Sequence, residues 1–500
     1  MRIGLVYLGR ENPELEYLSA ALKAAGHTID FIYDPGSFSR VDNVLYSPAL
    51  EKRYSRRAML IEQVRTRPPD LLYFFVYNTS FRWSLELAAE FRALCDAPIV
   101  FGGRHPTFAP DAVMSRDVVD IVVEGEGEET APEMAAAIES GSNLETVSGL
   151  YFRRNGKVIY SGLRPPIEDL DALPFPDKSL FDREISPADD YNIWIGRGCP
   201  GRCTFCQEGI LRRKYGAKVF RRRSIDNIIA ELSEMKKRYD FRHVFISDPV
   251  FFTPKRWVLD LLKKYKREIG VPFRCYGQLR HLDEEVAWAL KDAGCYGAEF
   301  GFQTANDYVR REILDRAETT QDAKDTFAVC DRVRLRYDVD HIFGLPGESD
   351  PDFVDAARIY ANATYLNRVK VHMLVYFPGA PILETAQSMG LADEEDFRRA
   401  QEGEAGDICR VGSVQWDQTE KRVREWKNFY KLMPLLPSKW AHKFIDRGWN
   451  RYFDRLPGPV VMLLQILVAI RGGDRRFWIY IKYIAFRIRR HRELIGGGKS

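Results

Sequence analysis

The chain has 500 residues, of which 45% are hydrophobic and 29% charged, and it contains eight cysteines. This composition predicts a globular protein of two or three domains. Eight cysteines in so long a chain disfavour a secreted disulfide framework and indicate the reducing cytoplasm. The opening MRIGLVYLG is typical of a first strand and not of a signal sequence. No apolar run reaches the roughly 18 residues that a membrane-spanning helix needs. The nearest is VVMLLQILVAI at 460–470.

The net charge of +3 is distributed unevenly. Residues 421–500 contain 19 Lys and Arg against 5 Asp and Glu, a net charge of +14, so the rest of the chain is anionic. One end of the molecule is therefore suited to an anionic neighbour.

Short apolar runs alternate with helical patterns over residues 1–145. The strand-like runs are 2–8, 28–34, 70–77, 97–103 and 120–128, and the helical patterns are 13–27, 80–96 and 128–141. This alternation predicts a parallel sheet with helices on its faces, a doubly wound domain of Rossmann type. Its ligand should lie at the carboxyl ends of the strands.

The pattern changes after residue 145. Residues 146–190 contain a predicted hairpin with Asn155-Gly156 as its turn and a Pro-rich stretch, which together indicate a linker. Six strand and helix units follow over 191–395, as expected for a partial barrel of parallel strands. Residues 396–500 form a helical, aromatic and basic region. The fold class is α/β with a helical C-terminal part.

Three cysteines, Cys199, Cys203 and Cys206, lie within GRGCPGRCTFCQEG after the first predicted barrel strand. A structural zinc site requires four ligands, and the isolated Cys275, Cys295, Cys330 and Cys409 offer no obvious fourth. A disulfide would leave one thiol over. The third interpretation is a four-iron cluster with three protein thiolates and one open iron, which can chelate a substrate.

This C-x-x-x-C-x-x-C spacing, with Phe205 before the last cysteine, resembles the radical S-adenosylmethionine superfamily. The resemblance implies that the three cysteines hold a [4Fe-4S] cluster whose open iron binds the amino and carboxylate groups of S-adenosylmethionine. It also implies an electron donor of flavodoxin or ferredoxin type.

Other barrel segments resemble the same superfamily. The resemblance implies contacts to S-adenosylmethionine from Asp248 and Pro249 in VFISDPVFFTPKRW, and from Gly344 and Pro346 in DHIFGLPGE. Gln303 stands where relatives usually carry Glu, which leaves its role open. Each of these segments is also compatible with a strand end and a tight turn that touch no ligand.

The first domain lacks the nucleotide fingerprint, since YLGRENPE follows its first strand. EYLSAALKAAGH, VFGGRHPTFAPDAV, DIVVEGEGEET and PPIEDLDALPFPD instead resemble the cobalamin-binding domain of cobalamin-dependent radical S-adenosylmethionine enzymes. The resemblance covers roughly residues 1–395. It implies that cobalamin is bound by residues of the two glycine-rich loops, where backbone can approach a large planar ligand: Gly102, Gly103, Gly125, Glu126 and Gly127.

Many corrinoid proteins carry an Asp-x-His-x-x-Gly loop after the first strand, whose histidine coordinates cobalt from below. Here that position holds GRENPE. The resemblance therefore implies water or an empty lower face. His105 is an alternative ligand, although a loop histidine before proline is more often a turn or hydrogen-bonding residue.

The tail interleaves aromatic with basic residues, as in RRFWIYIKYIAFRIRRHR at 475–492. A helical cap with a solvated basic face and an amphipathic helix at an anionic membrane surface are about equally compatible with this pattern. Nucleic-acid binding ranks third.

The resemblance implies a cytoplasmic methyltransferase that acts on an unactivated carbon or phosphorus. The basic, aromatic tail adds the hypothesis that the substrate is hydrophobic and that the protein is peripheral on the inner face of the membrane. Two alternatives stay open. One is a cobalamin-dependent radical oxidase or cyclase of the porphyrin-cyclase type, without net methyl transfer. The other is a non-catalytic corrinoid or lipid-surface binding protein with a structural cluster.

Overall fold

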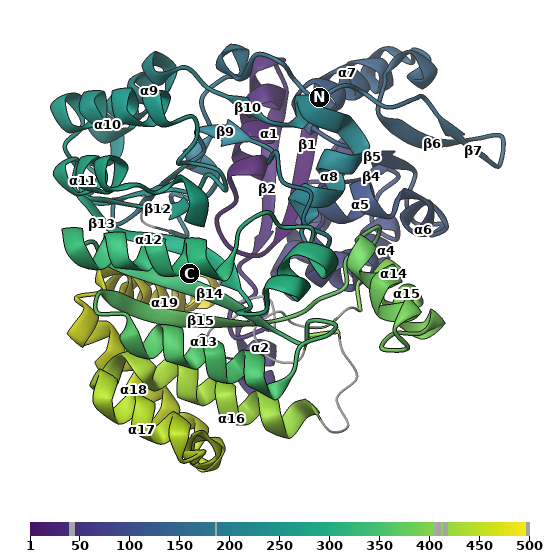
Figure 1. The fold of residues 1–500 in the computed structure, drawn as a ribbon. Helices are drawn as coiled ribbons and strands as arrows, with labels where there is room; N and C mark the ends of the chain where they lie inside the picture. Colours follow the sequence, from purple (N-terminus) through teal and green to yellow (C-terminus); the bar gives the residue numbers. More distant parts are fainter. Residues whose placement is uncertain (40–45, 186–187, 405, 407–411, 414–418, 497–500) are drawn as a thin grey trace.

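The computed structural model describes residues 1–39, 46–185, 188–404, 406, 412–413 and 419–496, and Cys409 lies outside these residues. The chain forms an N-terminal α/β domain, a six-stranded parallel sheet wrapped by helices, and a helical C-terminal region (Figure 1). The α/β fold class expected from the sequence is confirmed.

The first sheet has the strand order β2-β1-β3-β4-β5-β6-β7. Its five parallel strands are β1 (Arg2–Leu8), β2 (Thr28–Asp34), β3 (Leu71–Phe75), β4 (Ile99–Gly102) and β5 (Ile121–Val123). The order reverses between β1 and β3, which is the switch point where doubly wound sheets bind ligands. The accompanying helices are α1 (Pro13–Ala24), α2 (Pro48–Tyr54), α3 (Arg57–Thr66), α4 (Phe81–Arg92), α5 (Arg104–Phe108), α6 (Pro110–Met114) and α7 (Gly127–Ser140).

The hairpin that was expected in the linker continues this first sheet. Strand β6 (Leu150–Arg154) pairs antiparallel with β5 and with β7 (Lys157–Tyr160). Leu150 and Phe152 are buried in the core of the first domain. The predicted boundary at residue 145 therefore falls inside one continuous sheet, because local turn chemistry does not reveal which sheet a hairpin joins.

The second sheet is a partial barrel of six parallel strands in the order β15-β14-β13-β12-β11-β8. The strands are β8 (Tyr191–Ile193), β11 (Val244–Ile246), β12 (Phe273–Gly277), β13 (Cys295–Gln303), β14 (Tyr337–Phe343) and β15 (Leu366–Met373). The connecting helices are α9 (Ile225–Tyr239), α10 (Lys255–Glu268), α11 (Glu284–Asp292), α12 (Thr320–Val333) and α13 (Asp350–Asn362). A small antiparallel pair, β9 (Gly196–Arg197) and β10 (Arg221–Arg222), stands beside the first barrel strand.

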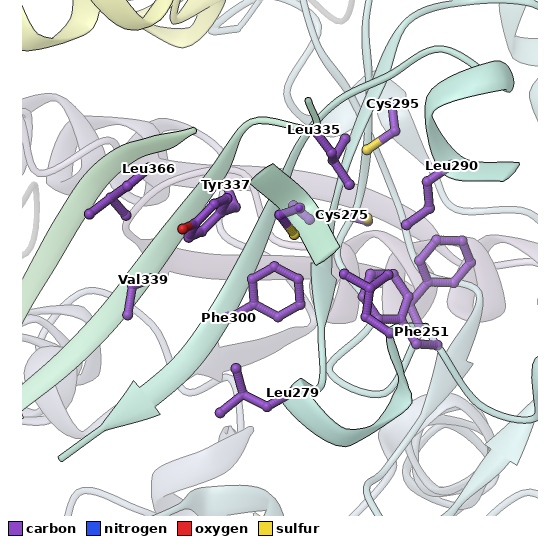
Figure 2. Close-up of a cluster of buried hydrophobic side chains, with 14 of the residues drawn as sticks. Phe251, Cys275, Leu279, Leu290, Cys295, Phe300, Leu335, Tyr337, Val339 and Leu366 are labelled. Carbon is purple, nitrogen blue, oxygen red and sulfur yellow. The ribbon is translucent and has the colours of Figure 1, made fainter. Parts of the chain in front are cut away.

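Apolar side chains fill the barrel on the side of its helices. Figure 2 shows Cys275 and Cys295 among Leu290, Leu335 and Phe300. Both sulfur atoms belong to this buried core, so these cysteines serve packing and are not ligands.

The C-terminal helices pack on the last barrel strand and reach back to the first domain. They comprise α14 (Pro381–Ser388), α15 (Glu394–Gln401), α16 (Thr419–Leu432), α17 (Ser438–Asp446), α18 (Gly458–Gly472) and α19 (Arg475–Gly496), with a 3-10 segment, η10 (Trp449–Arg455). Helices α16 and α18 contact β15. The imidazole Nε2 of His491 in α19 lies 3.2 Å from the carbonyl oxygen of Arg53, which ties α19 to the first domain.

Within the described residues, no single helix is both long and apolar enough to cross a membrane. Taken together, the bent pair η10 and α18 meets that test of length and composition, with 115° between the two segments.

Candidate active site

A cavity of about 290 Å³ lies between the first domain and the barrel, at the carboxyl ends of both sheets. This is where open α/β sheets and parallel barrels bind their ligands. One wall comes from β3 and from the loops that follow β4 and β5, and the other from residues on either side of the three cysteines and from the ends of β11 and β12. The three cysteines are not among the residues that line the cavity. Its walls include Tyr73, Gly103, Arg104, Gly125, Glu126, Gly127, Glu128, Trp194, Arg197, Gly198, Glu208, Tyr215, Ser247, Pro249 and Tyr276.

The three cysteines lie on the loop between β9 and α8 (Gln207–Tyr215), and Cys206 directly precedes this helix. The loop begins at Gly198, whose φ is +75° and where a Cβ atom would collide with the backbone carbonyl of Val219. Only glycine fits this position. The backbone N–H of Gly201 donates to the Sγ of Cys199 at 3.3 Å. The sequence thus folds the motif into a compact loop at the cavity.

The three thiols lie on one loop, and an iron-sulfur cluster is held by cysteine thiolates. Across the described part of the chain, no three His, Cys, Asp or Glu side chains gather around one ion position. Burial raises the pKa of the Cys199 thiol to about 12 and that of Cys203 to about 11, so cluster assembly must displace their protons.

Arg316 is a cation close enough to Cys203 to act on its thiol. Its charge lowers the pKa of Cys203, although burial raises it more. One guanidinium nitrogen of Arg316 donates to the carbonyl oxygen of Gly301 at 3.0 Å and to Glu318 at 3.1 Å. The residue lies 13 positions after Gln303 at the end of β13 and so shows no local motif.

Tyrosine side chains occupy the space beside the glycine loops. A Cβ atom at Gly102 would collide with the hydroxyl of Tyr73, and one at Gly125 with the hydroxyl of Tyr215. The glycines therefore make room for two rings that line the cavity. The Tyr215 hydroxyl is buried and has no hydrogen-bond partner among the described residues, so it can bond to an amide of a bound ligand.

Buried ion pairs join the two domains around the cavity. Arg197, two residues before Cys199, pairs with Glu128 and lies 3.7 Å from Glu126. Arg221 makes a bidentate pair with Glu126, whose pKa falls below its usual value because these arginines outweigh the effect of burial.

Two further pairs cross the same boundary. Arg104 of the first domain binds Glu208 of α8 at 2.8 Å, and Lys214 binds Glu124 at 2.5 Å. The cysteine loop and its helix are thus held directly against the loops of the first domain.

Comparisons with known proteins agree with this architecture. Residues 10–135 match the B12 binding domain and residues 193–359 match the Radical SAM superfamily. A relative from Synechocystis sp., described as an uncharacterized methyltransferase, is 31% identical over 419 residues, which cover 79% of this chain and 70% of the relative. The chain belongs to the cobalamin-binding radical S-adenosylmethionine family. Its cofactors are a [4Fe-4S] cluster, S-adenosylmethionine and cobalamin.

Two other relatives are similar over a smaller share of their own length. An uncharacterized methyltransferase of Pyrococcus horikoshii is 28% identical over 306 residues, 60% of this chain and 65% of the relative. The anaerobic magnesium-protoporphyrin IX monomethyl ester cyclase of Rubrivivax gelatinosus is 23% identical over 349 residues, 67% of this chain and 59% of the relative. The chain therefore spans less than two thirds of either protein.

A solved structure shows the same fold. The radical S-adenosylmethionine methyltransferase TsrM from Kitasatospora setae, with cobalamin and a [4Fe-4S] cluster bound, superimposes with a TM-score of 0.62 at 19% identity, covering 79% of each chain.

The predicted cobalamin residues divide into two groups. Gly103, Gly125, Glu126 and Gly127 line the cavity, and their contact with cobalamin stays a prediction. The Glu126 carboxylate is bound by arginines and by the backbone N–H of Ile167 at 2.9 Å, so it organises the loop. Gly102 lies behind the wall, in β4.

His105 does not line the cavity. It is 1% exposed, and its ring centroid lies 4.2 Å from that of Phe81. Burial lowers its pKa to about 3, an effect that a backbone contact at Gln401 only partly opposes. This placement fits a buried packing histidine and provides no ligand from His105 to cobalt.

The barrel residues are placed beside the cysteine loop. Asp248 is 1% exposed and accepts from Val250 N–H at 2.7 Å and from Arg222 at 3.2 Å, while its neighbours Ser247 and Pro249 line the cavity. Phe205 packs in a small apolar cluster with Ile210.

Gln303 is the last residue of β13, and the Gly-Pro turn follows β14. Gln303 has a φ of +66°, a conformation that costs a non-glycine residue about 1–3 kcal/mol. Its Oε1 is buried with no partner among the described residues. Gly344, with a φ of +87°, and the buried Pro346 form the turn after β14.

Replacing His105 by Phe is expected to leave cobalamin binding within about twofold of the native protein, since the ring faces Phe81. In the electron paramagnetic resonance spectrum of the Co(II) form, splitting from an imidazole nitrogen should be absent before and after the change. Loss of such splitting in the variant would establish His105 as the lower ligand.

The same substitution should change the acid stability. The pKa of His105 is about 3 in the folded chain and about 6.5 when unfolded, so the unfolded state binds the extra proton between these values. The contribution of neutral His105 to the free energy of unfolding is fully present above pH 6.5. It falls by about 2–3 kcal/mol on acidification to roughly pH 4.5. Urea midpoints of His105→Phe should fall less over that range, and the exposed His281→Phe should follow the native protein.

Proposed function

We propose that the protein is a methyltransferase that moves a methyl group to an unactivated carbon or phosphorus of a hydrophobic substrate. The observation that carries the proposal is the shared cavity, which is lined by residues on both sides of the cysteine motif, such as Gly198 and Glu208, and by the glycine loops of the cobalamin domain. Methyl transfer to a substrate radical requires that both cofactors face one enclosed space.

When bound, the cluster with S-adenosylmethionine supplies a radical that removes a substrate hydrogen, and cobalamin supplies the methyl group. The chain's own residues hold and orient these groups. Cys199, Cys203 and Cys206 would ligate the cluster, and the loops at Gly103 and Gly125 would hold cobalamin. Electrons come from a donor of flavodoxin or ferredoxin type.

Apolar and aromatic side chains form part of the cavity wall, beside the charged pairs, and limit the access of water to the reacting atoms. Tyr73, Phe75 and Leu18 face the cavity from the first domain, and Trp194 and Leu211 face it from the barrel side. Such walls favour a hydrophobic substrate, since desolvation of an apolar ligand is favourable. They also protect a substrate radical from side reactions.

The competing function is oxidation or cyclisation without net methyl transfer, which the similarity to the Rubrivivax cyclase keeps open. The two functions differ in the fate of the methyl group. After anaerobic reconstitution with iron, sulfide and hydroxocobalamin, we expect about four irons and one cobalt per chain.

The reconstituted protein is then given methyl-deuterated S-adenosylmethionine and an apolar extract of the source cells. Deuterated methyl groups in an extracted product support methyl transfer. Products that lose hydrogen or close a ring without gaining the label contradict it in favour of the cyclase type. Iron without cobalt also overturns the methyltransferase proposal.

A further inference from the structure

The outer face of α18 is apolar and exposed. Leu463 is 59% exposed and Ile470 is 54% exposed, and the same face presents Val460, Met462 and Leu467. These positions fall on one side of a helix whose opposite side, with Val461 and Val468, is buried. A surface helix of a soluble protein carries polar residues on its outer face. The outer face of α18 is instead apolar, which is typical of a surface that contacts a partner or a membrane.

No charge interrupts α18 before Arg471. A nitrogen of that guanidinium donates to the carbonyl oxygens of Pro434 and Leu435, at 3.1 and 2.8 Å, and fixes the C-terminal end of the helix on the rest of the chain. The helix has 15 residues. At about 1.5 Å per residue it is shorter than the roughly 30 Å hydrocarbon core of a bilayer.

Exposed aromatic rings paired with cations precede α18 in the chain. Tyr452 of η10 is 46% exposed, and its ring is contacted by Arg451 and Arg455. Trp440 of α17 is 49% exposed, with the ammonium of Lys443 at 4.7 Å from its ring. Aromatic rings with neighbouring cations are typical of the level of lipid headgroups.

We propose that α18 lies in the plane of an anionic bilayer, with its outer apolar face among the acyl chains. The net charge of +14 over residues 421–500 supplies the attraction to anionic headgroups. A second copy of the chain is less suited than a bilayer to cover this face, because a twofold axis through it would bring two strongly cationic regions together. The inference does not depend on which reaction the cavity supports.

Flotation of the full-length reconstituted protein with vesicles tests this placement. The vesicles contain phosphatidylcholine with phosphatidylglycerol, or phosphatidylcholine alone. We expect the protein to float with the anionic vesicles in low salt and to be released by high salt only in part, since apolar contact resists screening. The double variant L463E/L467E should partition on the order of 100-fold more weakly, because two leucines leave the acyl region.

The matched control is V158E/W288E, which places the same charges on two exposed apolar residues outside the tail. It should float like the native protein, and both variants should keep native iron content and circular dichroism. Arg451→Glu/Arg455→Glu should weaken flotation on anionic vesicles.

Three results would overturn the inference. The native protein does not float in low salt, or L463E/L467E and V158E/W288E lose flotation equally, or L463E/L467E converts a native dimer to a monomer while flotation persists. A variant that does not fold is replaced by L463S/L467S, for which the same outcomes apply.

Discussion

Replacing Cys203 by Ala is expected to reduce 5′-deoxyadenosine formation to the background of iron-free protein. The thiol lies on the loop before α8 together with Cys199 and Cys206, and removing it leaves two ligands for the cluster. Iron content and the visible absorption of the reconstituted protein should fall together with the cleavage of S-adenosylmethionine. Cobalamin binding should persist, because the glycine loops that form its wall belong to the first domain.

Cys95→Ala is the matched control, since Cys95 is a half-buried free cysteine outside the site. It should keep native iron, cobalt and 5′-deoxyadenosine formation. A Cys203→Ala protein that still forms 5′-deoxyadenosine at the native rate would remove both the methyltransferase and the cyclase from consideration. The remaining function would be the non-catalytic corrinoid or lipid-surface binding protein.

The sequence was sufficient for the two parallel sheets, because period and turn chemistry are local properties. It also placed the three cysteines, since all their spacing lies within one loop. The hairpin at 150–160 was misplaced into a linker, because its partner β5 is recognised only by long-range pairing. Local patterns report which elements form and not which edge they join.

The site shows the same division. From the sequence, Gly102 and Gly125 are predicted to let the backbone approach cobalamin, whereas in the structure the space that a Cβ atom would need at each position is taken by the hydroxyl of Tyr73 or Tyr215. The sequence does not indicate the role of Arg197, although it lies beside the cysteine motif, because that role depends on Glu128, 69 residues earlier. His105 could not be placed from the sequence either, since only the packed ring of Phe81 shows which way it faces.

Replacing Arg197 by Met is expected to uncouple the two cofactors. The change leaves the Glu128 carboxylate, whose side chain is 6% exposed, without its buried partner. Breaking a buried pair in this way costs about 3–5 kcal/mol of stability. Because the pair joins the two domains, this loss weakens the contact between them. Cleavage of S-adenosylmethionine should continue, because the three cysteines remain. Methyl transfer should fall by about 100-fold, since it depends on the exact spacing of two separately held cofactors.

The rescue pattern separates positioning from simple stability. R197M/E128Q removes the uncompensated charge, so it should recover unfolding midpoints while methyl transfer per 5′-deoxyadenosine stays low. Arg197→Lys keeps the charge and should recover part of that ratio. Arg65→Met, which breaks an exposed pair with Glu62, should change neither quantity. If Arg197→Met instead lost iron and both activities in parallel, Arg197 would serve only to hold the cysteine loop. The link between Arg197 and the cobalamin domain would then have no part in the reaction.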